Sequence, residues 1–130
     1  MAQWILVVED NPANLELLTD WLESEGYMVE SAENLEQSRA ALSKRRPGVV
    51  LLDVQLGRED GLALVPWIRQ QESLRDLPVV AVTAHAMVTD QKRVIAAGCN
   101  ACLAKPIDFK ALAKGLTEWI QPAASVTSDA

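Results

Sequence analysis

The chain has 130 residues, of which 18 are acidic and 12 are basic, for a formal net charge of −6. This length suits one domain with a substantial core, and a hydrophobic fraction of 49% excludes a disordered chain. The acidic balance disfavours nucleic acid as a partner, and no apolar run is long enough to span a bilayer. Because the start of the chain also lacks the basic segment that opens a signal peptide, a cytoplasmic protein with no membrane partner is expected.

Short aliphatic runs predict five strands along the chain. Continuous apolarity, rather than alternation with polar residues, is typical of strands buried on both faces of a parallel sheet. The runs are WILVV (4–8), VVLLDV (49–54), VVAVT (79–83) and ACLA (101–104), together with the half-polar YMVES (27–31).

Helical patterns alternate with these strands. Pro12 suits a first helical turn, Asp108 suits an N-cap, and Pro66 should delay the first turn of the third helix. The KRR run at 44–46 lies where a helix should end, and cations there complement the helix dipole. The expected helices run from Pro12 to a stop at Gly26, from near Asn34 to KRRPG, over GLALVPWIRQQ, within HAMVTDQKRVIAAG, and from Asp108 to Trp119 or Ile120.

Five strands that alternate with five helices predict a (βα)₅ domain of the α/β class. Right-handed crossovers favour a doubly wound, five-stranded parallel sheet with the flavodoxin-like order 2-1-3-4-5. This domain is expected to cover residues 1–121, and the small, polar segment 122–130 is expected to form a flexible C-terminal tail.

Polar side chains follow four of the predicted strands. Glu9 and Asp10 follow the first strand, Asp53 lies near the end of the third, Thr83 ends the fourth, and Lys105 follows the fifth. Ligands of such sheets bind beyond the carboxyl ends of the strands. Three carboxylates crowded there repel one another unless a hard cation lies among them, and Mg²⁺ prefers such oxygen ligands.

These residue types suit one reaction, the transfer of a phosphoryl group. With Mg²⁺ bound, an aspartate can attack phosphorus and form an acyl phosphate. Lys105 would then face the negative oxygens of the transferred group, and the Thr83 hydroxyl would donate a hydrogen bond to one of them. Each signal alone is common in ordinary loops, and an acidic pair before a helix often only complements its dipole. Their joint occurrence at successive strand ends favours the phosphoryl-transfer hypothesis.

Over residues 3–121 the chain resembles the receiver domain of response regulators in two-component signalling. The matching motifs are ILVVEDNPAN, VVLLDVQLGREDGLAL, VVAVTAHAM and GCNACLAKPID. The resemblance implies that Asp53 is the phosphoacceptor and that Mg²⁺ is the cofactor, for which Mn²⁺ is expected to substitute. It implies that Asp10, Asp53 and the backbone carbonyl of Gln55 bind the metal, and that Glu9 assists through a water molecule.

The resemblance also implies roles for the remaining site residues and for partners. Thr83 and Lys105 would bind the phosphoryl oxygens, and the peptide bond between Lys105 and Pro106 would be cis. The phosphoryl donor would be a phosphohistidine on a sensor histidine kinase or a histidine phosphotransfer protein, and phosphorylation would switch the binding of a downstream protein. The chain would be a signalling protein rather than an enzyme, although it would catalyse its own phosphorylation and dephosphorylation. A stand-alone receiver is expected, in preference to one excised from a hybrid kinase.

The switch region and the loop after Asp53 depart from the family's pattern. Gly57 stands where proline is common, which should make this loop less rigid. Cys102 takes the place of the family's switch aromatic, so the coupling in which Thr83 moves and an aromatic ring turns inward lacks its ring. His85 is expected to line the rim of the site, where this position and that of Gln55 tune the lifetime of the acyl phosphate in receivers.

Three alternatives remain beside this hypothesis. A pseudo-receiver would bind partners without phosphorylation, but the intact acids and Lys105 argue against it. A flavin-binding protein of the same fold is disfavoured because EDNPAN places carboxylates where an FMN phosphate needs backbone amides. A thiol redox protein would use the CxxC pair Cys99 and Cys102. These cysteines follow a helix's C-terminal glycine rather than lying at a helix N-terminus that lowers a thiol pKa, so buried, inert thiols are expected.

Overall fold

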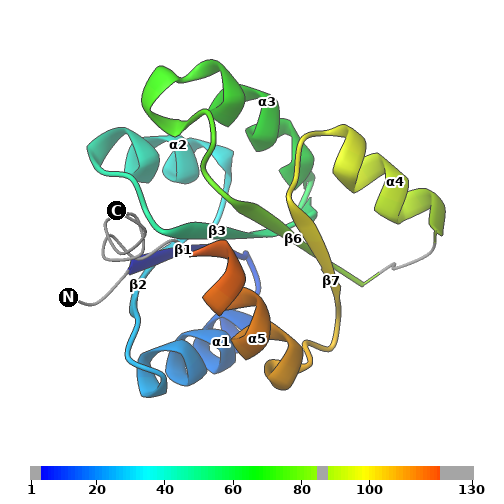
Figure 1. The fold of residues 1–130 in the computed structure, drawn as a ribbon. Helices are drawn as coiled ribbons and strands as arrows, with labels where there is room; N and C mark the ends of the chain where they lie inside the picture. The colour runs from blue at the N-terminus through cyan, green and yellow to red at the C-terminus, as the bar shows by residue number, and fades with distance from the viewer. Residues whose placement is uncertain (1–3, 85–87, 121–130) are drawn as a thin grey trace, which may run out of the picture.

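A parallel sheet of five strands forms the centre of the computed structural model, which describes residues 4–84 and 88–120, without the side chains of 88–90. The strand order is β2-β1-β3-β6-β7 (Figure 1). Because β6 and β7 are the fourth and fifth strands of this sheet along the chain, the predicted order 2-1-3-4-5 is confirmed. The strands are β1 (Trp4–Val8), β2 (Met28–Ala32), β3 (Val49–Asp53), β6 (Val79–Thr83) and β7 (Ala101–Ala104).

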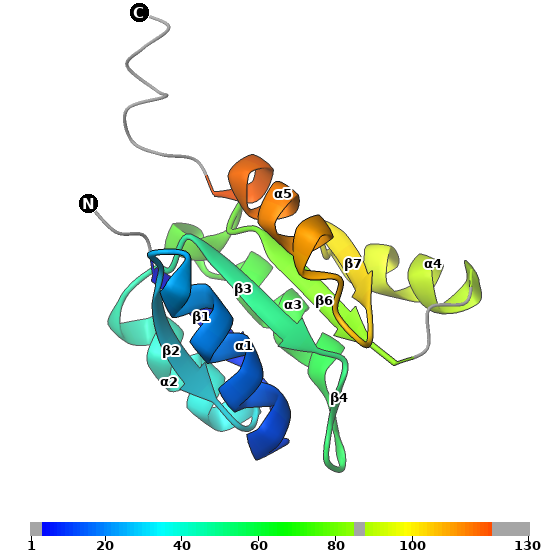
Figure 2. The same ribbon diagram turned by 90° about the horizontal axis from the view of Figure 1, so that it is seen from below.

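Helices cover both faces of the sheet, with α1 and α5 on one face and α2, α3 and α4 on the other (Figures 1 and 2). Three of the predicted start signals act as expected. Pro12 is the first residue of α1, Asp108 accepts hydrogen bonds as the N-cap of α5, and a 3₁₀ turn at Gly61–Ala63 delays α3. The helices are α1 (Pro12–Ser24), α2 (Leu35–Lys44), α3 (Leu64–Gln70), α4 (Val88–Ala96) and α5 (Phe109–Trp119).

The sheet separates two apolar cores. All five residues of β1 are buried, and their side chains alternate between the faces. Ile5 and Val7 pack in the core beneath α1 and α5, whereas Leu6 and Val8 pack in the core beneath α2, α3 and α4. The strands β3 and β6 are buried along their whole lengths in the same way. Burial on both faces explains why these strands read as continuous apolar runs.

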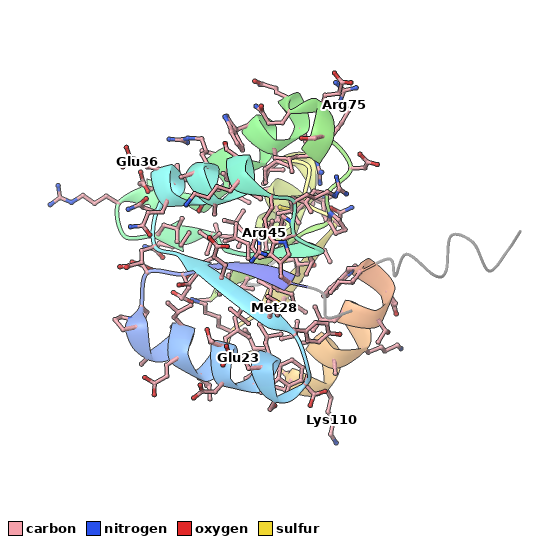
Figure 3. The ribbon with its side chains drawn as sticks, turned by 90° about the vertical axis from the view of Figure 1, so that its left-hand side faces the viewer. Glu23, Met28, Glu36, Arg45, Arg75 and Lys110 are labelled. Carbon is pink, nitrogen blue, oxygen red and sulfur yellow. The ribbon has the colours of Figure 1, made fainter. Side chains whose placement is uncertain are left out.

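The basic run that begins at the last residue of α2 packs against the start of the sheet rather than forming a free patch. The guanidinium of Arg45 lies 4.2 Å from the centroid of the Trp4 ring, and the indole of Trp4 donates a 2.9 Å hydrogen bond to the Arg46 carbonyl. Figure 3 shows Arg45 on the side of the molecule that carries the edge strand β2 with Met28. These contacts bury Trp4 at the start of β1, and Lys44 ends α2 as predicted.

A short hairpin follows β3 and was not predicted. In it β4 (Gln55–Leu56) pairs antiparallel with β5 (Glu59–Asp60), and the hairpin projects beyond the end of β3 (Figure 2). Gly57 lies at its turn with a φ of 58°. Proline is locked near a φ of about −65° and cannot adopt this conformation, so glycine at this position permits the hairpin.

Among the helices of the described residues, none is long and apolar enough to cross a membrane. The predicted tail, 122–130, lies outside the residues that the structure describes.

Candidate functional site

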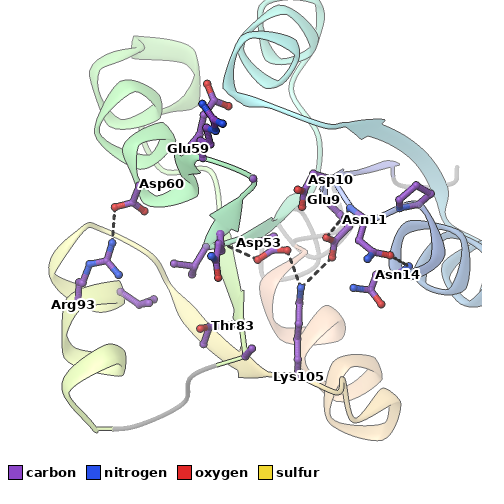
Figure 4. A pocket seen from close by; sticks show the side chains of 17 residues that line it. Glu9, Asp10, Asn11, Asn14, Asp53, Glu59, Asp60, Thr83, Arg93 and Lys105 are labelled. Carbon is purple, nitrogen blue, oxygen red and sulfur yellow. Dashed lines mark hydrogen bonds and ion pairs between the residues drawn. The ribbon is translucent and has the colours of Figure 1, made fainter.

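The parallel sheet brings the expected polar residues to one edge. Asp53 is the last residue of β3 and Thr83 is the last residue of β6, whereas Glu9 directly follows β1 and Lys105 directly follows β7. All four line one cleft of about 730 Å³, together with Asp10 and Gln55 (Figure 4). The cleft lies beyond the carboxyl ends of the strands, where ligands of open parallel sheets bind.

Lys105 forms the centre of the site. Its Nζ lies 2.7 Å from Oδ2 of Asp53 and 3.3 Å from Oε1 of Glu9 (Figure 4). Burial disfavours the charged ammonium, but the hydrogen bonds and charges of Asp53 and Glu9 outweigh it and raise the pKa of Lys105 above its ordinary value. Lys105 therefore carries a positive charge at neutral pH and holds both acids. The peptide bond that joins it to Pro106 is cis, the isomer that the resemblance implies.

Burial perturbs the titration of Glu9 more than its charged neighbours do. Its side chain is only 7% exposed, and burial together with the neighbouring Asp53 raises its pKa to about 7. The backbone N–H of Asn11, which donates to Glu9 Oε2 at 3.2 Å, and the charge of Lys105 oppose this rise without cancelling it. The ammonium of Lys105 therefore does not fully offset burial and the neighbouring Asp53, and a second cation would stabilise the ionised carboxylate of Glu9.

The acids are spaced to hold that cation. Glu9, Asp10 and Asp53 each offer a carboxylate oxygen, and these oxygens lie within 4.8 Å of one another. Mg²⁺ takes oxygen ligands in a small shell and keeps several waters, so this donor set and its uncompensated charge fit Mg²⁺. Gln55 follows Asp53 by two positions and lines the same cleft.

The Asp53 carboxylate is held at both oxygens. Its Oδ1 accepts a 3.0 Å hydrogen bond from the backbone N–H of Gln55, while Oδ2 faces Lys105. Gly61 packs directly against the backbone of Asp53. A Cβ at Gly61 would lie 2.0 Å from the Asp53 carbonyl oxygen, so only glycine permits this close approach. The N–H of Gly61 also donates a 2.6 Å hydrogen bond to the Val54 carbonyl. Gly61 was not identified from the sequence, where only its position eight residues after Asp53 could have marked it.

The switch region is described in part. Thr83 is buried at the end of β6 and lines the cleft. Cys102 lies in β7 opposite Ala81 of β6, half-buried against the core beneath α2, α3 and α4. His85 lies outside the described residues, so its expected place at the rim remains a prediction.

The two cysteines do not have the environment of a reactive pair. Cys99 is buried, and this burial raises the pKa of its thiol to about 11. The thiolate is the reactive form, so Cys99 is protonated and inert at neutral pH. This environment disfavours the thiol redox alternative.

Sequence reasoning missed an ion pair at the mouth of the cleft. Arg93 of α4 donates to Oδ2 of Asp60, at the end of β5, over 2.5 Å (Figure 4). Both residues line the cleft, and 33 positions of chain separate them. No spacing rule connects residues so far apart, so only the folded arrangement reveals the pair.

Known proteins resemble this chain in sequence and in fold. The model of the response regulator receiver domain family matches residues 5–117. The polar-differentiation response regulator DivK of Brucella anthropi is 36% identical over 107 residues, which cover 82% of this chain and 87% of DivK.

Solved receiver domains share the fold. The receiver domain of the sensor histidine kinase PA1611 from Pseudomonas aeruginosa, which holds a magnesium ion in its active site cleft, is 35% identical with a TM-score of 0.84, covering 92% of this chain and 98% of that one. The signal receiver domain of a histidine kinase from Syntrophus aciditrophicus is 33% identical with a TM-score of 0.82, covering 91% and 89%. Because the family model matches residues 5–117, which is most of the chain, this chain belongs to the response regulator receiver domain family.

Proposed function

We propose that this protein is a phosphoacceptor, in which Mg²⁺-dependent transfer of a phosphoryl group from a partner's phosphohistidine to Asp53 switches the binding of a downstream protein. The observation that carries the proposal is the 2.7 Å contact between Lys105 Nζ and Asp53 Oδ2, in the cleft that also gathers Glu9 and Asp10. A buried carboxylate with its own ammonium and with two further acids beside it is the arrangement that phosphoryl transfer requires.

The metal ligands of this proposal are Asp10, Asp53 and the backbone carbonyl of Gln55, with Glu9 acting through a water molecule. When bound, Mg²⁺ would neutralise charge on the acids and on the phosphoryl oxygens, and Mn²⁺, which accepts the same oxygen donors, would substitute. Burial and the neighbouring Asp53 raise the pKa of Glu9 despite the charge of Lys105, and this supports a cation at this place.

The protein's own residues would carry the transfer. One carboxylate oxygen of Asp53 forms a bond to phosphorus while the bond between phosphorus and the donor imidazole nitrogen breaks, and the imidazole leaves. Lys105 stabilises the negative charge on the transferred group, and the hydroxyl of Thr83 donates a hydrogen bond to one of its oxygens. The contacts from Lys105 and from the Gln55 N–H hold the Asp53 carboxylate in place before the donor arrives.

The donor in this proposal is a sensor histidine kinase or a histidine phosphotransfer protein, and the protein acts in the cytoplasm. Two similar structures, those from Pseudomonas aeruginosa and Syntrophus aciditrophicus, are receiver domains of histidine kinases, which supports a donor of this kind. The net charge of −6 supports a protein partner over a nucleic acid.

The direct test is phosphorylation by a small donor. Wild type, Asp53→Asn and the control Asp76→Asn are incubated with acetyl phosphate, with Mg²⁺ or with a chelator, and intact mass is recorded. Asp76 is exposed just before β6, at the opposite edge of the sheet from the cleft, so its variant makes the same chemical change elsewhere. We expect one phosphoryl group on wild type and Asp76→Asn with Mg²⁺, and none on Asp53→Asn or after chelation. Equal labelling of Asp53→Asn refutes the assignment, and an unlabelled wild type indicates a pseudo-receiver.

A further inference from the structure

The ion pair between Arg93 and Asp60 joins α4 to the hairpin that follows Asp53. The contact from the Arg93 guanidinium to Asp60 Oδ2 measures 2.5 Å, and the two side chains are 52% and 51% exposed. Both residues line the cleft that contains Asp53 and Lys105 (Figure 4). Arg93 is therefore a further cation, beside Lys105 and Arg58, in the cleft of the phosphoacceptor, and in the resting state Asp60 engages it.

The acid in this pair has a second anchor on the backbone. Asp60 Oδ1 accepts a 3.0 Å hydrogen bond from the Leu62 N–H, which anchors the carboxylate to the backbone. Next to it, Glu59 Oε1 accepts a 3.0 Å hydrogen bond from the Leu35 N–H at the start of α2, so the hairpin is also held from its other side. Arg93 reaches the pair on a long, half-exposed side chain, which can exchange one partner for another at little cost.

Resting on the function proposed above, we propose that Arg93 is a second phosphoryl-binding cation and that Asp60 competes with the phosphoryl group for it. A phosphoryl group on Asp53 brings a negative charge and three strong acceptor oxygens into the cleft. The forked guanidinium binds such oxygens with two parallel hydrogen bonds, which a single carboxylate oxygen does not match. Arg93 then turns from Asp60 to the phosphoryl group, and α4 loses its tie to the hairpin.

The proposal predicts opposite effects from the two halves of one ion pair. Loss of the charge on Asp60 releases Arg93 toward the incoming phosphoryl group and speeds phosphorylation. Loss of the charge on Arg93 removes the cation and slows it. A pair that only stabilised the fold would give changes of the same direction in both variants, because each variant breaks the same contact.

Initial rates of labelling by acetyl phosphate at saturating Mg²⁺ test this prediction. We expect Asp60→Asn to react about two- to fivefold faster than wild type and Arg93→Gln about two- to fivefold slower, the size of effect that one half-exposed charge produces. The Asn side chain keeps an oxygen that can accept from the Leu62 N–H, so its effect reports charge. The double variant should react at the rate of Arg93→Gln, and Arg93→Lys should lie between Arg93→Gln and wild type.

Two controls separate this role from a general change of charge. Lys92→Gln removes a positive charge from the adjacent position on α4. Glu72→Gln removes a negative charge from an exposed position in the 3₁₀ turn Glu72–Leu74, and neither residue lines the cleft. Both should react at the wild-type rate. Rates for Asp60→Asn and Arg93→Gln that change in the same direction, or that equal those of the controls, overturn the proposal while leaving Asp53 as phosphoacceptor. A wild type that is not labelled overturns the proposed function, and the role of Arg93 with it.

Discussion

The ammonium of Lys105 lies 2.7 Å from Oδ2 of Asp53, although 52 positions of chain separate the two residues. They do not come from neighbouring strands, because β6 lies between β3 and β7 in the sheet. The lysine therefore reaches across the end of β6, beside Thr83, to meet the acid. This contact joins the carboxyl ends of β3 and β7. It also makes the stability of the resting protein depend on the groups that would perform its chemistry.

Removal of Lys105 should destabilise the metal-free protein. In Lys105→Met, Asp53 and Glu9, whose side chains are each only 7% exposed, lose their common cation. We expect a loss of about 1–3 kcal/mol of unfolding free energy. Urea denaturation at pH 8 measures it. Lys110→Met, which changes an exposed residue of α5, is the control. If the two variants are equally stable, the contact contributes nothing to the fold.

Glu9 should make the stability of the metal-free protein depend on pH. The pKa of Glu9 rises from 4.5 to about 7 on folding, because of burial first and of Asp53 second. Between these two pH values the native state holds a proton that the unfolded chain releases. The contribution of Glu9 to the free energy of unfolding is therefore complete below pH 4.5 and is lost as pH rises through 7. We expect the free energy of unfolding to fall by on the order of 2–3 kcal/mol across this range.

Urea denaturation at a series of pH values in a chelator, for wild type and Glu9→Gln, checks this expectation. The glutamine variant cannot ionise and should lack the decline between pH 5 and 8. Mg²⁺ should stabilise wild type more at pH 8 than at pH 6, because at pH 6 the ion must first displace the proton from Glu9. A parallel pH profile for the two proteins would show that Glu9 does not carry the raised pKa.

The sequence predicts those parts of the fold whose physical cause is local or periodic. The strands β1, β3 and β6 are buried on both faces, so their apolar runs match their bounds to within a residue. The half-polar edge strand β2 was predicted at 27–31 and lies at Met28–Ala32. Glu9 and Asp53 could be placed because the ends of parallel strands share an edge.

The missed features depend on contacts that no local pattern encodes. The strands β4 and β5 have two residues each, which is too short for any alternation to show. The pairing of Arg93 with Asp60 depends on where α4 packs, and the contact of Gly61 with the Asp53 carbonyl depends on how the chain turns back after the hairpin. These features arise from tertiary packing, and they surround the site rather than form its centre.

Gly61→Ala should displace the phosphoacceptor. The added methyl group would lie 2.0 Å from the Asp53 carbonyl oxygen, so the backbone must shift, and we expect about 1–3 kcal/mol of destabilisation. Labelling by acetyl phosphate should slow even where the variant is fully folded. The comparison is Gly26→Ala, whose methyl group meets nothing within 4 Å but whose φ of 93° is strained. That variant should lose stability and keep the wild-type labelling rate, and equal rates in both variants would contradict a positioning role for Gly61.

Cys99 should stay unreactive in the native protein at neutral pH. Burial raises the pKa of its thiol from 9.0 to about 11, against the opposing charge of Arg69. The native state therefore retains a proton that the unfolded chain loses, so the stability gained is complete below pH 9 and is lost as pH rises through 11.

Titration with a chromogenic disulfide at pH 7 should modify Cys99 only as fast as the protein unfolds, and urea should speed the reaction. Cys99→Ala identifies the signal of Cys102, which is half-buried. Rapid modification of both thiols in the folded protein would restore the redox hypothesis, because a buried, protonated thiol cannot react at that rate.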